Sequence, residues 1–133
     1  MTNLHMTKAY AKGYRAEHEM VHTLSKLGFM VIRAPRSGRI GLPSPDIVAI
    51  KNGKILVIEC KSREDAFTVE KEQLAELEAW KNHGAVALLA WKQTRKGWTF
   101  LHLSDVSANN GNIGKKFAAE KGFSLEKIHE ILN

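Results

Sequence analysis

Residues 45–61 read PDIVAIKNGKILVIECK, and this stretch predicts two adjacent β-strands joined by a tight turn. The residues on both sides of the turn are mostly apolar and β-branched. The Asn52-Gly53 pair between them is the strongest short-range signal for a type I′ hairpin. A two-residue loop at this place pairs residues whose numbers add to 105. Asp46 is therefore expected to lie opposite Glu59, with the two Cβ atoms about 5 Å apart.

Asp46, Glu59 and Lys61 form a predicted charged cluster at the open end of this hairpin. Side chains alternate along a strand, so Lys61 is expected on the same face as Glu59. Two opposed carboxylates repel and destabilise a sheet unless a cation lies between them. Acid, acid and lysine at the end of apolar strands are costly to bury and indicate a functional site that binds a metal. For either acid taken singly, a salt-bridged strand end at the solvent boundary is the alternative.

The two hairpin strands are otherwise apolar on both faces, which predicts central strands that are covered on both sides. The order of the predicted elements is α-β-β-β-α-β-β-α, which is typical of an α/β fold: one domain with a mixed central β-sheet flanked by α-helices. Outside the hairpin, hydrophobic periodicity and turn residues predict helices over 7–27 and 69–82, strands over 29–34, 85–92 and 98–103, a loop over 35–45, and a short terminal helix near 125–132.

The length of 133 residues is typical of one domain with its own core. We expect a single domain over 1–133, with 1–8 as a flexible N-terminal arm and 105–133 as a tail that docks through a short helix. The single cysteine, Cys60, excludes an internal disulfide and is predicted to pack rather than to react. Apolar runs are far shorter than the roughly 20 residues of a membrane helix, and the first residues lack a signal-peptide pattern, so a soluble cytoplasmic protein is expected.

The positive charge of the chain is concentrated in its first half. Twenty Lys+Arg against fourteen Asp+Glu give a net charge of +6. Residues 1–64 hold eleven basic against five acidic residues, or +6, whereas 65–133 hold nine of each, or zero. This asymmetry indicates a surface for a polyanion such as nucleic acid, although charge for solubility alone is the alternative.

Four motifs in the basic half resemble a known nuclease family. Pro45-Asp46 with Glu59-Cys60-Lys61 matches the core of the PD-(D/E)xK nuclease superfamily. The surrounding segments 12–17, 28–37 and 58–62, which read KGYRAE, GFMVIRAPRS and IECKS, resemble the archaeal-type Holliday junction resolvases (Hjc-like). The resemblance runs from about Lys12 to Leu103, and it implies a restriction-endonuclease-like fold.

The resemblance also implies roles for the residues of the charged cluster. Asp46 and Glu59 would bind a divalent metal, with the backbone carbonyl of Cys60 as an extra ligand and Glu17 as a third acid. An oxygen-only ligand set suits Mg²⁺, and Mn²⁺ is expected to support activity as well. Ser37 resembles the family's loop serine near the scissile phosphate, although a turn former is the simpler interpretation. Lys61 would orient or help deprotonate the attacking water, with a salt bridge to Glu59 as the alternative.

The basic residues around this cluster are predicted to contact DNA. Such contacts hold the phosphate backbone without reading bases, so recognition of shape rather than sequence is expected. His18 stands where the family usually has arginine, which leaves a phosphate contact there in question. The other histidines are predicted to be structural or surface residues. The predicted DNA-binding residues are Lys12, Arg15, His18, Arg33, Arg36, Arg39 and Ser62.

The resemblance implies a metal-dependent endonuclease of DNA recombination and repair that resolves four-way (Holliday) junctions by paired symmetric nicks. Two symmetric nicks on a two-fold junction require two sites, so a homodimer is expected. Its partner is branched DNA, at the nucleoid, with no membrane and no small-molecule cofactor. The alternatives are a nuclease of the same core for another branched or duplex DNA substrate, or a non-catalytic DNA-architectural module.

Overall fold

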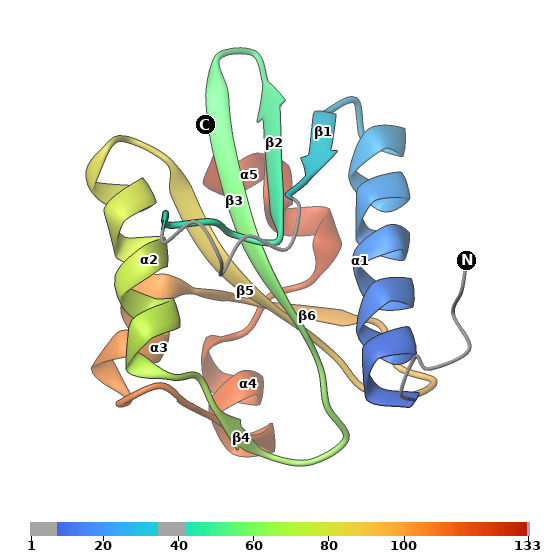
Figure 1. Ribbon diagram of the computed structural model, residues 1–133, viewed down its shortest axis with the longest axis vertical. Helices are drawn as coiled ribbons and strands as arrows, with labels where there is room; N and C mark the ends of the chain where they lie inside the picture. Colours follow the sequence, from blue (N-terminus) through green and yellow to red (C-terminus); the bar gives the residue numbers. More distant parts are fainter. Residues whose placement is uncertain (1–7, 35–41, 133) are drawn as a thin grey trace.

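A computed structural model describes residues 8–34 and 42–132 of the chain. A five-stranded sheet crosses the molecule, with helices on both of its faces (Figure 1). This mixed α/β architecture is the one predicted from the sequence. The elements are α1 (Lys8–Lys26), β1 (Met30–Arg33), β2 (Ile47–Lys51), β3 (Lys54–Ser62), β4 (Phe67–Thr68), α2 (Lys71–Asn82), β5 (Val86–Lys92), β6 (Trp98–His102), α3 (Leu103–Ala108), β7 (Asn112–Ile113), α4 (Lys115–Lys121), the 3-10 turn η2 (Leu125–Lys127) and α5 (Ile128–Ile131).

The central sheet has the strand order β1-β2-β3-β5-β6, and only the β3–β5 pair is parallel. The β2–β3 hairpin has the predicted register, since Ile47 pairs with Ile58 and each later pair also adds to 105. Asn52 and Gly53 have φ angles of 51° and 80°, as a type I′ turn requires. The hairpin that carries the acids is therefore confirmed.

Each face of the sheet has its own core. On one face, α1 contributes Met20 and Leu24, and α5 contributes Ile128, all of them fully buried. On the other face, Leu77 of α2 and Val106 of α3 pack against the sheet. Figure 1 shows α1 and α2 on opposite sides of β3, so side chains of both helices can approach the end of this strand.

The C-terminal end of α1 is joined to the hairpin. Gly28 ends the helix with a φ of 94°, a conformation in which a side chain would be strained. Lys51 of β2 donates a hydrogen bond from Nζ to the carbonyl of Leu27 at 2.6 Å, which satisfies one of the last helix carbonyls. This contact links α1 to the hairpin, and so the helix that carries Glu17 to the strands that carry Asp46 and Glu59.

The prediction that the hairpin strands are covered on both faces is only partly right. Val57 is fully buried, but Ile50 is 45% exposed and Ile55 is 37% exposed. Both lie next to the hairpin turn, in line with Met30 of β1, which is 78% exposed. The prediction failed here because an apolar strand pattern does not show how far the covering helix extends, and α2 covers the sheet without reaching this end.

The segment after β6 holds more structure than the sequence pattern indicated. A short terminal helix was predicted, and α5 does dock through Ile128 and Leu132. In addition, α3 begins directly after β6, and β7 pairs with β4 in a second, two-stranded sheet. The predicted N-terminal arm lies outside the described residues, except that Lys8 begins α1. No helix in 8–34 or 42–132 is long and apolar enough to cross a bilayer.

Candidate active site

Asp46 stands in a bend just before β2, and backbone groups hold it from two sides. Its carbonyl accepts a hydrogen bond from the N–H of Ala34 at 2.8 Å. Its carboxylate oxygen Oδ2 accepts one from the N–H of Cys60, also at 2.8 Å. The β2–β3 pairing stops at Ile47, so β2 offers no backbone partner to Cys60. The Asp46 carboxylate accepts the Cys60 N–H in place of a backbone carbonyl. The bond fixes Asp46 beside the residue that follows Glu59.

Glu59 and Lys61 point to one face of β3, as the strand period predicts, and Gln73 of α2 joins them. Gln73 donates a hydrogen bond from Nε2 to Glu59 Oε2 at 3.0 Å, and its Oε1 accepts one from Lys61 Nζ at 2.8 Å. The direct distance from Lys61 Nζ to Glu59 Oε2 is 3.7 Å. The amide therefore holds the acid and the lysine at a set separation, and both side chains are largely buried.

Burial and charge act strongly on Glu59, which is only 8% exposed. Loss of solvation, followed by the negative charge of Asp46, raises the pKa of Glu59 to about 8; Glu17 also raises it and Lys61 lowers it. The carboxylates of Asp46 and Glu17 therefore repel that of Glu59, and the positive charge of Lys61 does not offset this repulsion. A dication would relieve this repulsion, and carboxylate oxygens are the ligands that hard dications prefer. The donor set fits such a metal.

The raised pKa of Glu59 makes the stability of the metal-free chain depend on pH. Between about pH 4.5 and pH 8 the folded chain binds a proton at Glu59 that the unfolded chain has released, so the free energy of unfolding falls as the pH rises. We expect a loss on the order of a few kcal/mol across this window. Urea denaturation in EDTA at pH 5, 6, 7 and 8 measures it. Glu59→Gln should flatten the dependence and Glu76→Gln, on the exposed side of α2, should not; equal pH slopes in all three proteins would contradict the assignment.

Glu17 approaches from α1, and Arg33 at the end of β1 holds it. Glu17 is only 6% exposed, so it is not a surface glutamate of the helix. Arg33 donates a hydrogen bond from Nε to Glu17 Oε1 at 2.7 Å, and its guanidinium lies 4.6 Å from the ring centroid of Tyr14. A charge-assisted hydrogen bond of this kind is shorter and stronger than one between neutral groups. Arg33, predicted as a phosphate contact, has a structural partner in Glu17.

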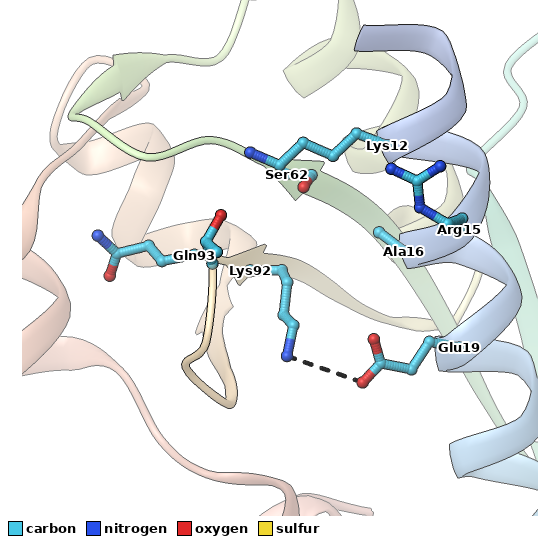
Figure 2. A pocket seen from close by; sticks show the side chains of 8 residues that line it. Lys12, Arg15, Ala16, Glu19, Ser62, Lys92 and Gln93 are labelled. Atoms are coloured by element: carbon cyan, nitrogen blue, oxygen red, sulfur yellow. Dashed lines mark ion pairs between the residues drawn. The ribbon is translucent and has the colours of Figure 1, made fainter. Parts of the chain in front are cut away.

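A cleft of about 360 Å³ opens beside the ends of β3 and β5 (Figure 2). It contains three of the predicted DNA contacts, together with Lys92, which the sequence did not single out. The side chains of Lys92 and Glu19 point toward each other across it, 3.8 Å apart at Nζ and Oε2. The cleft is lined by Lys12, Arg15, Ala16, Glu19, Ser62, Lys92, Gln93 and Thr94.

Glu64 joins two residues that line this cleft, Lys12 and Thr94. Lys12 donates to Glu64 Oε2 at 2.8 Å, and the backbone N–H of Thr94 donates to the same oxygen at 3.0 Å. Lys12, and after it Thr94, hold the pKa of Glu64 down at about 2. One exposed carboxylate thus joins α1 to the β5–β6 turn.

Known proteins resemble this chain in sequence and in fold. The family described as archaeal Holliday junction resolvase (Hjc) matches residues 8–133. The chain belongs to this family. The resemblance predicted from the sequence is thereby confirmed, as is the enzyme class, a nuclease that resolves Holliday junctions.

Individual Hjc relatives agree in sequence and in fold. A crossover junction endodeoxyribonuclease Hjc from Sulfurisphaera tokodaii is 31% identical over 128 residues, which cover 92% of this chain and 89% of that protein. The Archaeoglobus fulgidus Hjc structure, a Holliday junction resolvase, superposes with a TM-score of 0.79 at 28% identity and covers 90% of this chain and 99% of that one. A bacterial homing endonuclease, I-Ssp6803I, shares the fold with a TM-score of 0.63 at 14% identity, covering 95% and 94%. The predicted fold class is confirmed.

Some functional residues lie outside the sequence prediction or outside the described residues. Ser37, Arg36 and Arg39 fall in 35–41, so their predicted roles stay predictions. Gln73 was not singled out from the sequence. Its signal was a polar side chain on the apolar stripe of a helix, where a buried amide needs a partner. In the described part of the chain, no group of three or more His, Cys, Asp or Glu residues forms a ready-made metal site, so the two carboxylates are a partial ligand set.

Proposed function

We propose that this Hjc-family chain uses Asp46, Glu59 and Lys61 to cut four-way DNA junctions by paired symmetric nicks, with Mg²⁺ or Mn²⁺ bound at the two acids. The observation that carries this is the Glu59–Gln73–Lys61 arrangement beside Asp46. It places two carboxylates and an ammonium group at one strand end, at a cost in stability that a purely structural role does not explain.

The metal would be held by oxygen atoms. Asp46 and Glu59 are its carboxylate ligands in this proposal, and the backbone carbonyl of Cys60 is an added one. The Cys60 thiol is excluded as a ligand here, because burial raises its pKa well above the ordinary value and keeps it protonated. When bound, the metal would polarise the scissile phosphate and lower the pKa of a nearby water.

The remaining residues orient the groups that react. Lys61 is held at 2.8 Å by Gln73, so its ammonium has a defined position from which to direct a water toward phosphorus. Gln73 also fixes the orientation of the Glu59 carboxylate. Arg33 holds the Glu17 carboxylate in place by a hydrogen bond, near enough for Glu17 to act on the charge of Glu59.

The cleft of Figure 2 is proposed to hold the DNA backbone next to the cut. Arg15 and Lys92 provide positive charge, and Ser62 adds a hydroxyl donor. Ser62 is the last residue of β3 and follows Lys61, so the cleft lies at the same end of this strand as the charged cluster. Such contacts bind without reading base sequence.

This assignment predicts the salt dependence of binding. Each lost phosphate contact should lower the slope of log K against log salt by about one, so Arg15→Ala and Lys92→Ala should each flatten it. Junction binding in EDTA over a salt series measures the slope. The matched control is Lys54→Ala at the start of β3, the opposite end of the strand from the cleft residue Ser62. If both cleft variants kept the wild-type slope, the cleft would not be part of the DNA interface.

A homodimer is proposed because two symmetric nicks need two related sites. The face that supports it lies on β1, β2 and β3, where large apolar side chains are exposed in adjacent rows: Met30 at 78%, Ile32 at 64%, Ile50 at 45% and Ile55 at 37%. Exposed apolar patches on one face are typical of protein interfaces. A second copy of the chain is the proposed occupant, since it would present the same apolar rows.

Disruption of this face should separate the copies. Ile32→Lys with Ile50→Lys puts two charges into the proposed interface, and we expect the species in sedimentation to change from dimer to monomer. Ala119→Lys on exposed α4 adds a charge elsewhere and should leave the dimer intact. A wild-type chain that sediments as a monomer at micromolar concentration would reject the homodimer, and a double variant that stays dimeric would reject this face.

The proposed function has a direct test in a gel assay. A synthetic four-way junction and a linear duplex of the same sequence are incubated with the chain in Mg²⁺, in Mn²⁺ and in EDTA. We expect cleavage of the junction alone, and only with metal. Sequence-specific cutting of the linear duplex would favour another nuclease of this core, and metal-independent binding without cleavage would favour an architectural module.

An enzyme acting on branched chromosomal DNA is expected at the nucleoid in the cytoplasm.

A further inference from the structure

Two histidines lie on adjacent turns of α1 and face each other. His18 and His22 are four residues apart, and with the residues between them they read HEMVH. Both side chains are exposed. Their Nε2 atoms are 3.3 Å apart, and their ring centroids are 4.4 Å apart. Neither histidine indicates a site by itself; the i, i+4 spacing of the pair does.

The separation of the two Nε2 atoms fits one shared metal ion. With Zn–N bonds of about 2.1 Å, nitrogens 3.3 Å apart subtend about 104° at the metal, close to the tetrahedral angle of about 109°. Two histidines at i and i+4 on one helix are also the ligand arrangement of the H-E-x-x-H motif. We propose that His18 and His22 form a second metal site, which takes a borderline dication such as Zn²⁺ through two imidazole nitrogens, with water in the open positions.

This site differs in chemistry from the carboxylate site. Asp46 and Glu59 offer oxygen, which suits hard dications, whereas imidazole suits Zn²⁺, Ni²⁺ and Cu²⁺. The two sites also lie on different sides of α1. Glu17, which acts on the carboxylate site, is 6% exposed, whereas the adjacent His18 is on the exposed face of the helix. Excess Mg²⁺ should therefore leave the histidine pair available for Zn²⁺.

Neighbouring side chains define what the pair can do. The ring of Tyr14 stacks on His18 with an interplanar angle of 16°, and Arg33 covers Tyr14, so the His18 ring is held in a contiguous stack. Glu19, the acid of HEMVH, is directed to Lys92 in the cleft (Figure 2). Among residues 8–34 and 42–132 no third acid, cysteine or histidine completes a three-ligand centre. The motif therefore describes a two-ligand binding site and not a metalloprotease centre.

Imidazole resonances provide the test. The chain, labelled with ¹⁵N in its six histidines, is saturated with Mg²⁺ and titrated with Zn²⁺, and the ring nitrogens are followed by long-range ¹H–¹⁵N NMR. We expect saturable shifts at His18 and His22. His22→Gln removes one of two ligands and should weaken Zn²⁺ binding at least about tenfold, since loss of even an outer contact of a metal ligand costs that much.

Two controls make the result decisive. His83→Gln removes an exposed histidine whose Nδ1 lies 2.9 Å from the carbonyl of Ala79, and it should leave the Zn²⁺ affinity unchanged. Zn²⁺ should raise the melting temperature of the wild type and not that of the His18→Gln/His22→Gln variant, since a ligand stabilises the state that binds it. The proposal is overturned if the two imidazoles do not respond, or if the double variant binds Zn²⁺ as tightly as the wild type.

Discussion

Asp46→Asn or Glu59→Gln should abolish junction cleavage while junction binding in metal-free buffer survives. Each substitution keeps the shape of the side chain but removes the negative charge that a dication needs, and the two acids supply the carboxylate part of one ligand set. The expected loss is at least about a thousandfold in single-turnover rate, because removal of a metal ligand disables both water activation and charge stabilisation. We expect binding to be retained or strengthened, since a negative charge near phosphates has been removed.

The contrast between cleavage and binding separates a metal ligand from a folding residue. Thermal melts should show both variants folded, and Glu59→Gln should be at least as stable as the wild type above pH 7, since it relieves a buried charge. Glu76→Gln is the matched control on exposed α2 and should cut at the wild-type rate. Near wild-type cleavage by either acid variant in Mg²⁺ would show that the metal assignment is wrong.

Lys61→Ala should lower the single-turnover cleavage rate at least about a hundredfold with folding intact, in line with general acid–base contributions. The reason is position: Gln73 holds the ammonium at 2.8 Å, and the lysine side chain is 13% exposed, so water cannot easily replace it. If Lys61 were only the salt-bridge partner of Glu59, most activity would remain.

The size and hydrogen-bonding pattern of the lysine matter for this test. Lys61→Arg should not restore full activity, because a planar guanidinium does not replace a compact ammonium and does not release its proton. Lys71→Ala, at the exposed start of α2, is the matched control for loss of one positive charge nearby. Rates are compared at saturating enzyme and Mg²⁺ beside thermal melts, and a loss below tenfold for Lys61→Ala would return this residue to the salt-bridge role.

The hairpin and its acids could be predicted from the sequence because local chemistry determines them. Asn52 and Gly53 accept the positive φ angles of a type I′ turn, and this turn sets the pairing of the two strands. Period two then places Lys61 with Glu59. The pairing of the two strands stops at Ile47, the residue that follows Asp46. The Asp46 carboxylate accepts a hydrogen bond from the Cys60 N–H, and the alternating pattern of a strand does not predict this bond.

Contacts between distant segments were not predictable in the same way. Gln73 meets Glu59 and Lys61 only because α2 crosses the sheet beside the parallel β3–β5 pair, and this depends on packing. The backbone bond from Phe100 N–H to the Phe123 carbonyl likewise shapes the tail without any periodic signal. The cleft combines residues from α1, β3 and the β5–β6 turn, so composition indicated its charge but not its place.

A supercoiled plasmid that extrudes a cruciform tests the central claim most directly, because the cruciform exists only while the plasmid stays supercoiled. A single nick relaxes the plasmid and removes the junction, whereas two nicks made in one encounter give a linear molecule. We predict linear product in Mg²⁺ from the wild-type chain, and none from Glu59→Gln or from a plasmid without the cruciform. Open-circle product alone, or equal cutting of the plasmid without the cruciform, would contradict resolution of four-way junctions by paired nicks at this site.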